Sequence, residues 1–225
     1  GIPLRISFIL QILDEKSDVL SFDIVNISVI YDLWDEVYKI EGVFSGTLSY
    51  IFNNFNSETS FSEIVKIAKQ KGFTEPDPRE DLSGLDVRRK LIILSRETGL
   101  AMEPEHVNIQ NILPQACNDA ATVAELMVEI EKADDYFEGM RKAAADKGGV
   151  LRMIAKLEDG KASIALESVG TDHPFYALSG SDNMIVFTTE RYRERPLVVT
   201  GPGAGAEVTA AGVFAEIIKI GNYLK

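Results

Sequence analysis

The second half of the chain contains four segments that read as β-strands joined by short turns. They are VLRMIAKLE, KASIALESV, MIVFTTER and PLVVTG, and the turns between them contain Asp-Gly, Ser-Gly-Ser-Asp-Asn and Glu-Arg-Pro. Short runs that are rich in apolar and β-branched residues and bounded by turn residues predict strands that pair with their neighbours. The first and the last of these connections are short enough to join antiparallel neighbours, so this half of the chain is predicted to form a mainly antiparallel sheet.

The first half of the chain is mainly helical in pattern. Residues 37–48 alternate as one strand that runs into a Ser-Gly-Thr turn, and residues 48–55 predict the helix that follows. Residues 120–147 are rich in Ala, Glu, Met and Lys and predict two acidic helices. An amphipathic helix is predicted over residues 206–224. Helices followed by antiparallel strands are typical of an α+β fold.

The segment EPDPREDLSGLDVRRK, which begins at Glu75, gathers carboxylates and one lysine around a turn that leads into a helix. Its two prolines fix the backbone and hold Glu75 in place. Ser83 and Asp86 have the spacing of a capping box, and Asp86 and Lys90 lie four residues apart on one helix face. Such a pair is most often a surface salt bridge. In an active site, the same ammonium can protonate a developing alkoxide.

Composition excludes several classes of protein. The chain has 225 residues, 45% of them hydrophobic, which is enough for a packed core. Its net charge of −12 argues against a nucleic-acid surface. Its single cysteine, Cys117, cannot form an intrachain disulfide, and no apolar run is long enough to span a membrane. We therefore expect a protein of the cytoplasm, or of the plastid stroma if the source is a plant, with neither a nucleic acid nor a membrane as partner.

Three blocks of the sequence resemble the catalytic domain of homoserine dehydrogenases, in the same order. They are EGVFSGTLSYIFNNF, KGFTEPDPREDLSGLDVRRKLIILSRETG, and HPFYALSGSDNMIVFTTERY with GPGAGAEVTAAG. The resemblance covers residues 35–225 and implies a mixed sheet that helices cover on one face, and a homodimer that pairs across this sheet. Residues 1–34 match only faintly, through GIPLRISFILQIL, which resembles a turn that enters a helix.

The resemblance also implies a reaction, the reduction of L-aspartate 4-semialdehyde to L-homoserine with NADPH or NADH, in threonine, methionine and isoleucine biosynthesis. Lys90 falls on the family's proton donor. Asp86 falls on a substrate-binding carboxylate that also holds the lysine. Glu75 falls on a residue that contacts the substrate ammonium and neighbours the cofactor, and Asp81 falls on a further substrate contact.

The same resemblance assigns roles to several uncharged residues. Gly46 and Thr47 line the substrate pocket, as does Phe73, which stands where many relatives carry Tyr. Gly72 and Gly205 lie beside the cofactor, and the glycines before the last helix let backbone N–H groups approach a ligand. No metal ligand is assigned within the chain. A monovalent cation, Na⁺ or K⁺, would find its main ligands outside it.

No strand followed by a G-x-G-x-x-G turn precedes Glu41, and the first residue is Gly. We therefore expect a piece of a longer enzyme, without a complete Rossmann domain and inactive alone. Two other functions stay open, a non-catalytic binding or dimerisation module that keeps the fold, and a related oxidoreductase of another small carbonyl substrate. The complete charged set favours homoserine dehydrogenase over the second of these, while the missing motif keeps the binding module open.

Overall fold

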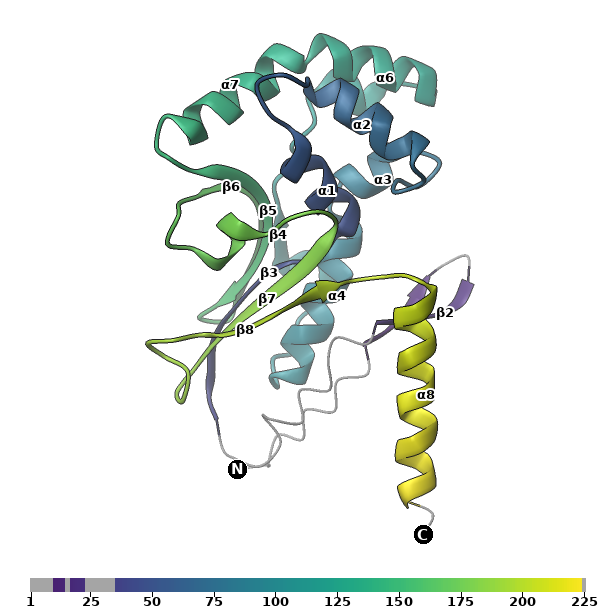
Figure 1. The fold of residues 1–225 in the computed structure, drawn as a ribbon, viewed down its shortest axis with the longest axis vertical. Coiled ribbons are helices and arrows are strands. Elements are labelled where there is room, and N and C mark those ends of the chain that lie inside the picture. Colours follow the sequence, from purple (N-terminus) through teal and green to yellow (C-terminus); the bar gives the residue numbers. More distant parts are fainter. Residues whose placement is uncertain (1–9, 15–16, 23–34, 224–225) are drawn as a thin grey trace.

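The computed structural model describes residues 10–14, 17–22 and 35–223, and a six-stranded sheet forms its centre (Figure 1). The strands lie side by side in the order β4 (Val107–Ile109), β6 (Lys161–Val169), β5 (Val150–Glu158), β3 (Val37–Val43), β7 (Asp182–Thr189) and β8 (Leu197–Pro202). Neighbouring strands are antiparallel except β4 and β6, which are parallel. The predicted mixed, mainly antiparallel sheet is confirmed.

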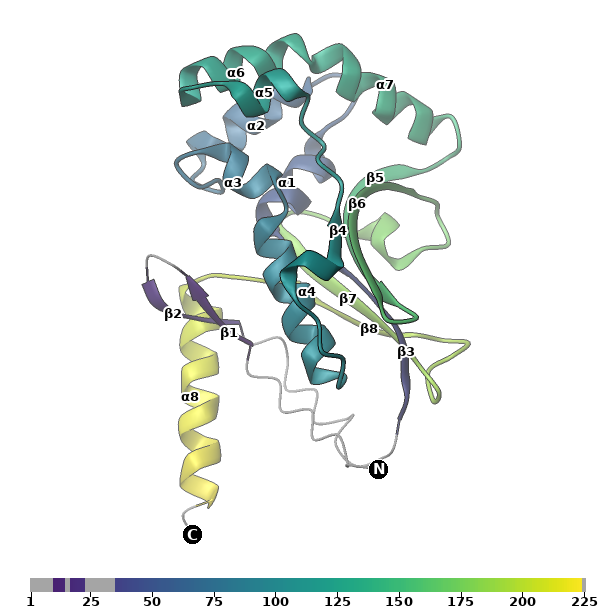
Figure 2. The ribbon, with the colours of Figure 1, turned by 180° about the vertical axis from the view of Figure 1, so that it is seen from behind.

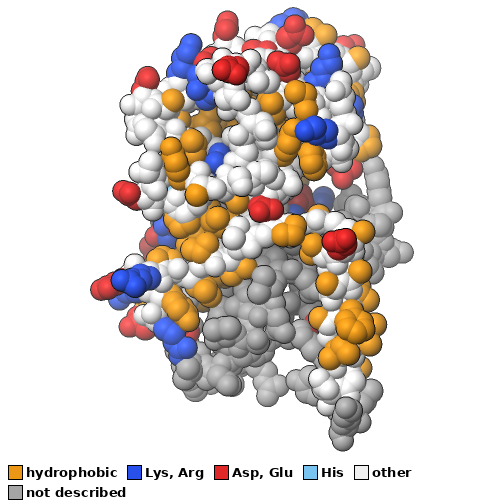
Figure 3. Space-filling model, viewed as in Figure 1, with side chains coloured by type: hydrophobic (Ala, Val, Ile, Leu, Met, Phe, Trp, Pro, Cys, Tyr) orange, Lys and Arg blue, Asp and Glu red, His pale blue; other side chains and the backbone are white. Residues whose placement is uncertain are grey.

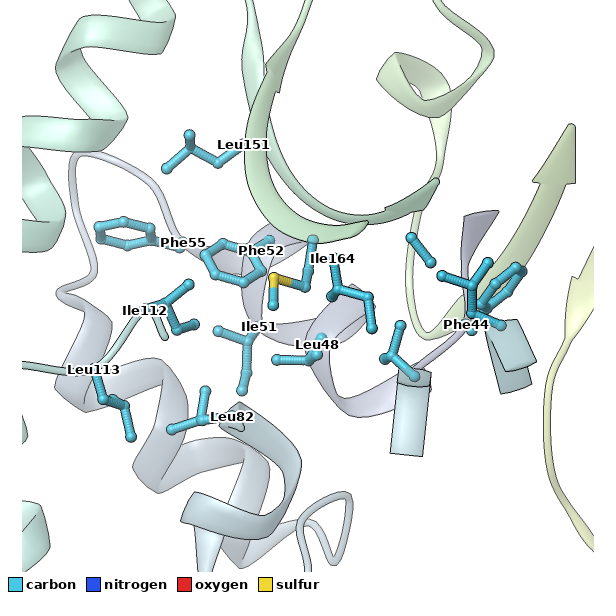
Figure 4. Packing of buried hydrophobic residues seen from close by; sticks show 14 of the residues in the cluster. Phe44, Leu48, Ile51, Phe52, Phe55, Leu82, Ile112, Leu113, Leu151 and Ile164 are labelled. Atoms are coloured by element: carbon cyan, nitrogen blue, oxygen red, sulfur yellow. The ribbon is translucent and has the colours of Figure 1, made fainter. Parts of the chain in front are cut away.

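Helices cover one face of this sheet, as predicted (Figures 1 and 2). They are α1 (Gly46–Asn54), α2 (Phe61–Gln70), α3 (Pro78–Leu82), α4 (Leu85–Glu97), α5 (Gln115–Asp119), α6 (Val123–Lys132) and α7 (Asp134–Ala145). Helices α1, α4 and α7 contact β5, while α2 packs against α1 and α6. The large apolar cluster lies between these layers, and Figure 4 shows Phe44, Leu48 and Ile51 within it.

The opposite face of the sheet carries a smaller apolar cluster under the short 3₁₀ helix η3 (Pro174–Ala177). Phe175 from η3 is fully buried there against residues of the sheet such as Val43, Ile154 and Val186. The two clusters make the α+β domain a sheet with a thick helical layer on one side and a thin cover on the other.

At the end of β3, close packing of the Phe44 ring requires a glycine at position 42. The ring of Phe44 folds back over Gly42, so that a Cβ atom at Gly42 would lie 1.9 Å from the ring. Phe44 itself is 1% exposed. Ser45 then caps α1 by accepting a hydrogen bond from the Leu48 N–H at 3.2 Å. Strand, turn and helix are therefore fixed within six residues.

The predicted capping box of Ser83 and Asp86 is wrong. Asp77 caps the short helix α3, which ends at Ser83, and the Ser83 hydroxyl donates to the Glu80 carbonyl. The chain then passes through Gly84, whose φ of +71° breaks the helix. Gly84 has no side chain to cap α4, but Ser83 Oγ accepts a hydrogen bond from the Leu85 N–H at 3.3 Å. The predicted helix after Ser83 is therefore present as α4, and the left-handed glycine separates it from α3, which was not predicted.

The first described segment of the chain contacts its last helix (Figure 1). A separate hairpin of β1 (Leu10–Asp14) and β2 (Ser17–Phe22) stands where the resemblance implied a helix. The period-2 alternation of Leu10, Gln11 and Ile12 fits this strand better than a helix. The predicted last helix is α8 (Ala206–Tyr223), which extends away from the body next to β2 (Figure 1).

Helix α8 exposes many large apolar side chains, which Figure 3 shows along its length. These are Val213, Phe214, Ile217, Ile218 and Ile220. Among the helices in the described ranges, none is long and apolar enough to cross a membrane.

Candidate active site

Most of the predicted site residues lie near one another because four consecutive elements meet beside the end of β3. They come from the start of α1 (Gly46, Thr47), the turn after α2 (Gly72, Phe73, Glu75), α3 (Asp81) and α4 (Asp86, Lys90). Helix α1 packs against α2 and α3, and α3 packs against α4. A contiguous stretch of sequence thereby folds into one polar region above the sheet.

Lys90 is a buried cation. Only 5% of the residue is exposed, and its Nζ lies 2.7 Å from Asp86 Oδ2 and 2.7 Å from the Phe44 carbonyl oxygen, to which it donates. Burial lowers the pKa of Lys90, while the charge of Asp86 opposes this shift. The pair is therefore not the solvated surface salt bridge that its spacing alone would suggest. A lowered pKa makes the Lys90 ammonium a stronger acid than that of an exposed lysine.

Asp81 connects the turn after α2 to α3. Its Oδ2 accepts a hydrogen bond from the Glu75 backbone N–H at 2.9 Å. Burial raises the pKa of Asp81 to about 6, although the hydrogen bond from the Glu75 N–H acts in the opposite direction. A carboxylate held this close to neutral titration belongs more often to a functional site than to an ordinary loop.

Thr47 ties the start of α1 to the same turn. Its hydroxyl donates to the Phe73 carbonyl oxygen at 2.5 Å. The Phe73 ring packs against Tyr50 with ring centroids 4.6 Å apart, yet Phe73 is 40% exposed. Because the bond to Thr47 uses the backbone of Phe73, it does not depend on which aromatic residue stands there.

Gly72 has a clear conformational role. It ends α2 at a φ of +74°, with its N–H donating to Lys69 and the N–H of Phe73 donating to Ala68 at 3.0 Å. These two bonds form a Schellman motif, which favours glycine. The following turn is held further by Lys69, whose ammonium donates to the Pro76 carbonyl. The exposed residue Glu75 therefore lies in a turn that hydrogen bonds hold in place, and its side chain faces solvent.

Gly205 lies apart from this region in the sequence, in the turn between β8 and α8. Its φ is +136°, and a Cβ atom there would meet no other atom within 4 Å. Open space in front of a helix N-terminus fits the close approach of a ligand to the backbone. Within the described ranges, no hydrogen bond or ion pair joins Gly205 to the residues around Lys90.

Sequence reasoning missed one member of the site, Phe44. Phe44 contributes a backbone carbonyl, and because every residue has one, the residue type gives no sign of this role. The position could have been noticed because Phe44 lies between the end of β3 and the start of α1, where a carbonyl outside the strand pairing is available to another element.

The fold and these contacts give an α+β domain in which a buried lysine pairs with the partly exposed carboxylate of Asp86, beside the turn that carries Glu75. The sequence matches the model of the homoserine dehydrogenase family over residues 25–218. The chain belongs to the homoserine dehydrogenase family.

Individual relatives agree. The chain is 49% identical over 192 residues to bifunctional aspartokinase/homoserine dehydrogenase 1, chloroplastic, of Arabidopsis thaliana, with 84% of this chain and 21% of that protein covered. It is 47% identical over 194 residues to homoserine dehydrogenase of Schizosaccharomyces pombe, with 83% and 52% covered. A crystal structure of a protein of unknown function from Candida auris matches with a TM-score of 0.79 and 41% identity, covering 84% and 55%. The chain thus spans about half or less of the length of these relatives.

Proposed function

We propose that this chain is the catalytic and dimerisation region of a homoserine dehydrogenase that reduces L-aspartate 4-semialdehyde to L-homoserine. The observation that carries the proposal is Lys90, a buried ammonium held between Asp86 and the Phe44 carbonyl. A desolvated ammonium in a fixed position is a suitable acid for an oxygen that becomes negative during reduction. The names of the relatives supply the substrate class.

The proposal gives each of the charged site residues a task. NADPH or NADH supplies the hydride when it is bound. Lys90 donates a proton to the aldehyde oxygen, and Asp86 keeps its ammonium in position. Glu75 accepts hydrogen bonds from the α-ammonium of the substrate. Asp81 holds the turn that presents Glu75 through the bond to the Glu75 N–H.

Two further groups shape the pocket and the cofactor contact. Gly46 and Thr47 line the substrate side, and Thr47 holds the backbone of Phe73. Gly72 and Gly205 approach the cofactor, with the open space at Gly205 as the observation that fits it. One such turn cannot anchor a dinucleotide, so the strand-turn-helix unit that binds its pyrophosphate is proposed to lie elsewhere in the enzyme, as are the main ligands of a monovalent cation.

The proposed homodimer pairs through the sheet face opposite the helices. This face is covered only partly by η3, and Val198 is 40% exposed on it. Glu41 on the same face makes ion pairs with Lys39 at 2.8 Å and Lys156 at 3.6 Å. A partner sheet would bury Val198, so Val198→Arg is expected to convert a particle of twice 24.8 kDa into a monomer, as measured by light scattering.

By the same proposal the enzyme works in the cytoplasm or a plastid, and the word chloroplastic in the name of the Arabidopsis relative supports the second location.

The test of function is Lys90→Ala in the complete enzyme. We expect kcat to fall by at least about 100-fold while the Kd of the nicotinamide cofactor stays within about twofold, because an acid acts mainly in the transition state. Lys142→Ala is the matched control, since Lys142 forms an i,i+4 pair with Glu138 on the surface at 3.5 Å. Equal kcat values for the two variants would remove Lys90 from the chemistry.

A further inference from the structure

Asn183 on β7 is a buried polar residue that the mechanism above leaves without a task. It is 9% exposed, and its Nδ2 donates to the Phe44 carbonyl oxygen at 3.2 Å. Met184 pairs with Val43 across β7 and β3, so Asn183 stands opposite Phe44 at the point where β3 ends. The same carbonyl accepts the hydrogen bond from Lys90 at 2.7 Å.

The orientation of this carboxamide follows from chemistry. If the amide were turned over, its Oδ1 would face the Phe44 carbonyl, and two acceptors would repel each other. With Nδ2 on Phe44, Oδ1 is buried and has no hydrogen-bond partner within the described part of the chain. A leucine of similar size would leave no such acceptor unsatisfied, so packing alone does not favour asparagine here. What the carboxamide adds is a donor to the Phe44 carbonyl.

A carbonyl oxygen has two lone pairs, and in this structure Lys90 takes one while Asn183 takes the other. The backbone on both sides of Asn183 is fixed as well. Its own carbonyl accepts a hydrogen bond from Thr200 on β8 at 3.2 Å, and the neighbouring Asp182 carbonyl accepts one from Ser49 on α1 at 2.8 Å. The donor therefore reaches Phe44 from a rigid strand.

We propose that Asn183 is a positioning residue for Lys90, which aims the Phe44 carbonyl at the lysine ammonium and thereby sets where the proton donor stands. This inference rests on the proposed function of Lys90. Among the described residues, Asp86 on the same helix contributes a charge that acts on Lys90, whereas β3 and β7 bring a carbonyl and a carboxamide. Loss of the carboxamide should make the protonated form of Lys90 less stable. A carboxylate in its place should make that form more stable.

The experiment compares Asn183→Leu and Asn183→Asp in the complete enzyme. For Asn183→Leu we expect kcat to fall roughly tenfold with an unchanged KM for the cofactor, since a small displacement of a catalytic group is costly. The high-pH limit of kcat should move down by about 0.5 pH unit or more, because the protonated lysine loses support, and Asn183→Asp should move it up. Asn118→Leu removes a similar bond, from Asn118 Nδ2 to the Leu113 carbonyl at 3.3 Å, and should change neither quantity.

Two further measurements separate positioning from simple damage. In a Lys90→Ala background, Asn183→Leu should slow the residual reaction by less than about twofold, whereas independent effects would multiply. A ¹⁵N NMR titration of the Lys90 ammonium needs no turnover, so it remains informative if the wild-type enzyme proves inactive with homoserine. A lower Lys90 pKa in Asn183→Leu supports the inference. An unchanged pKa, or multiplying rate losses, overturns it.

Discussion

Asp81 should make the protein less stable at neutral pH than it would be with a neutral side chain. Burial raises the pKa of Asp81 from 3.8 to about 6. A difference of this size corresponds to about 3 kcal/mol at roughly 1.4 kcal/mol per pKa unit, and we reduce it to about 1–2 kcal/mol because part of the carboxylate remains in contact with water. Asparagine keeps the shape and the acceptor for the Glu75 N–H, so Asp81→Asn should raise the free energy of unfolding by about this amount at pH 8.

The sign changes with pH in a defined window. A carboxyl group whose pKa is raised on folding destabilises the fold when it is ionised, so wild-type Asp81 loses this penalty as the pH falls from about 6 to about 4. The difference between Asp81→Asn and wild type should therefore be largest at pH 8 and vanish near pH 4. Urea unfolding followed by circular dichroism at several pH values measures it.

Asp77 provides the control of opposite sign. Its hydrogen bond from Arg79 lowers the pKa of Asp77, so its charge stabilises the fold at neutral pH. Asp77→Asn should destabilise at pH 8, and its effect should fade as the pH drops below the ordinary pKa of an aspartate. If Asp81→Asn also destabilised at pH 8, or if its effect did not vary with pH, the reasoning from burial would be refuted.

Four other outcomes are expected. Asp86→Asn should lower both kcat and the affinity for homoserine, measured by steady-state kinetics, and a change in KM alone would contradict its role beside Lys90. Glu75→Gln should weaken homoserine binding by about 1.5–3 kcal/mol in calorimetry but leave NADP binding nearly unchanged. Gly42→Ala should destabilise by about 1–3 kcal/mol because its Cβ would overlap the Phe44 ring, whereas Gly139→Ala in α7 meets no atom within 4 Å and should not destabilise. The span of residues 1–225 should fold yet show no NADP-dependent oxidation of homoserine.

The sequence predicted the sheet strands of the second half, the pair α6 and α7, and the last helix α8 because their patterns are local. It did not predict β4, which has only three residues and pairs in parallel with β6 far along the chain. It did not predict α3 either, because five residues are too few to show a helical period.

In the candidate site, too, local features could be predicted from the sequence and long-range contacts could not. Asp86 and Lys90 could be paired from their spacing, because a helix brings residues four apart together. The burial of Lys90 could not be predicted, since it depends on packing against β3. Asn183 stands in the turn-like run SGSDN of the sequence, and only the register of β7 on β3 brings it opposite Phe44.

Lys90, Asp81 and Asn183 have in common that each is unfavourable for folding alone. Lys90 loses solvation, Asp81 is held where its charge is disfavoured, and Asn183 leaves an acceptor without a partner in the described structure. Polar groups buried at such a cost are expected where a protein needs fixed charges and donors more than stability. Because α1, α3, α4 and the start of β7 converge beside the end of β3, the three penalties fall in one region of the fold, and that region is where the proposed reaction needs its proton donor.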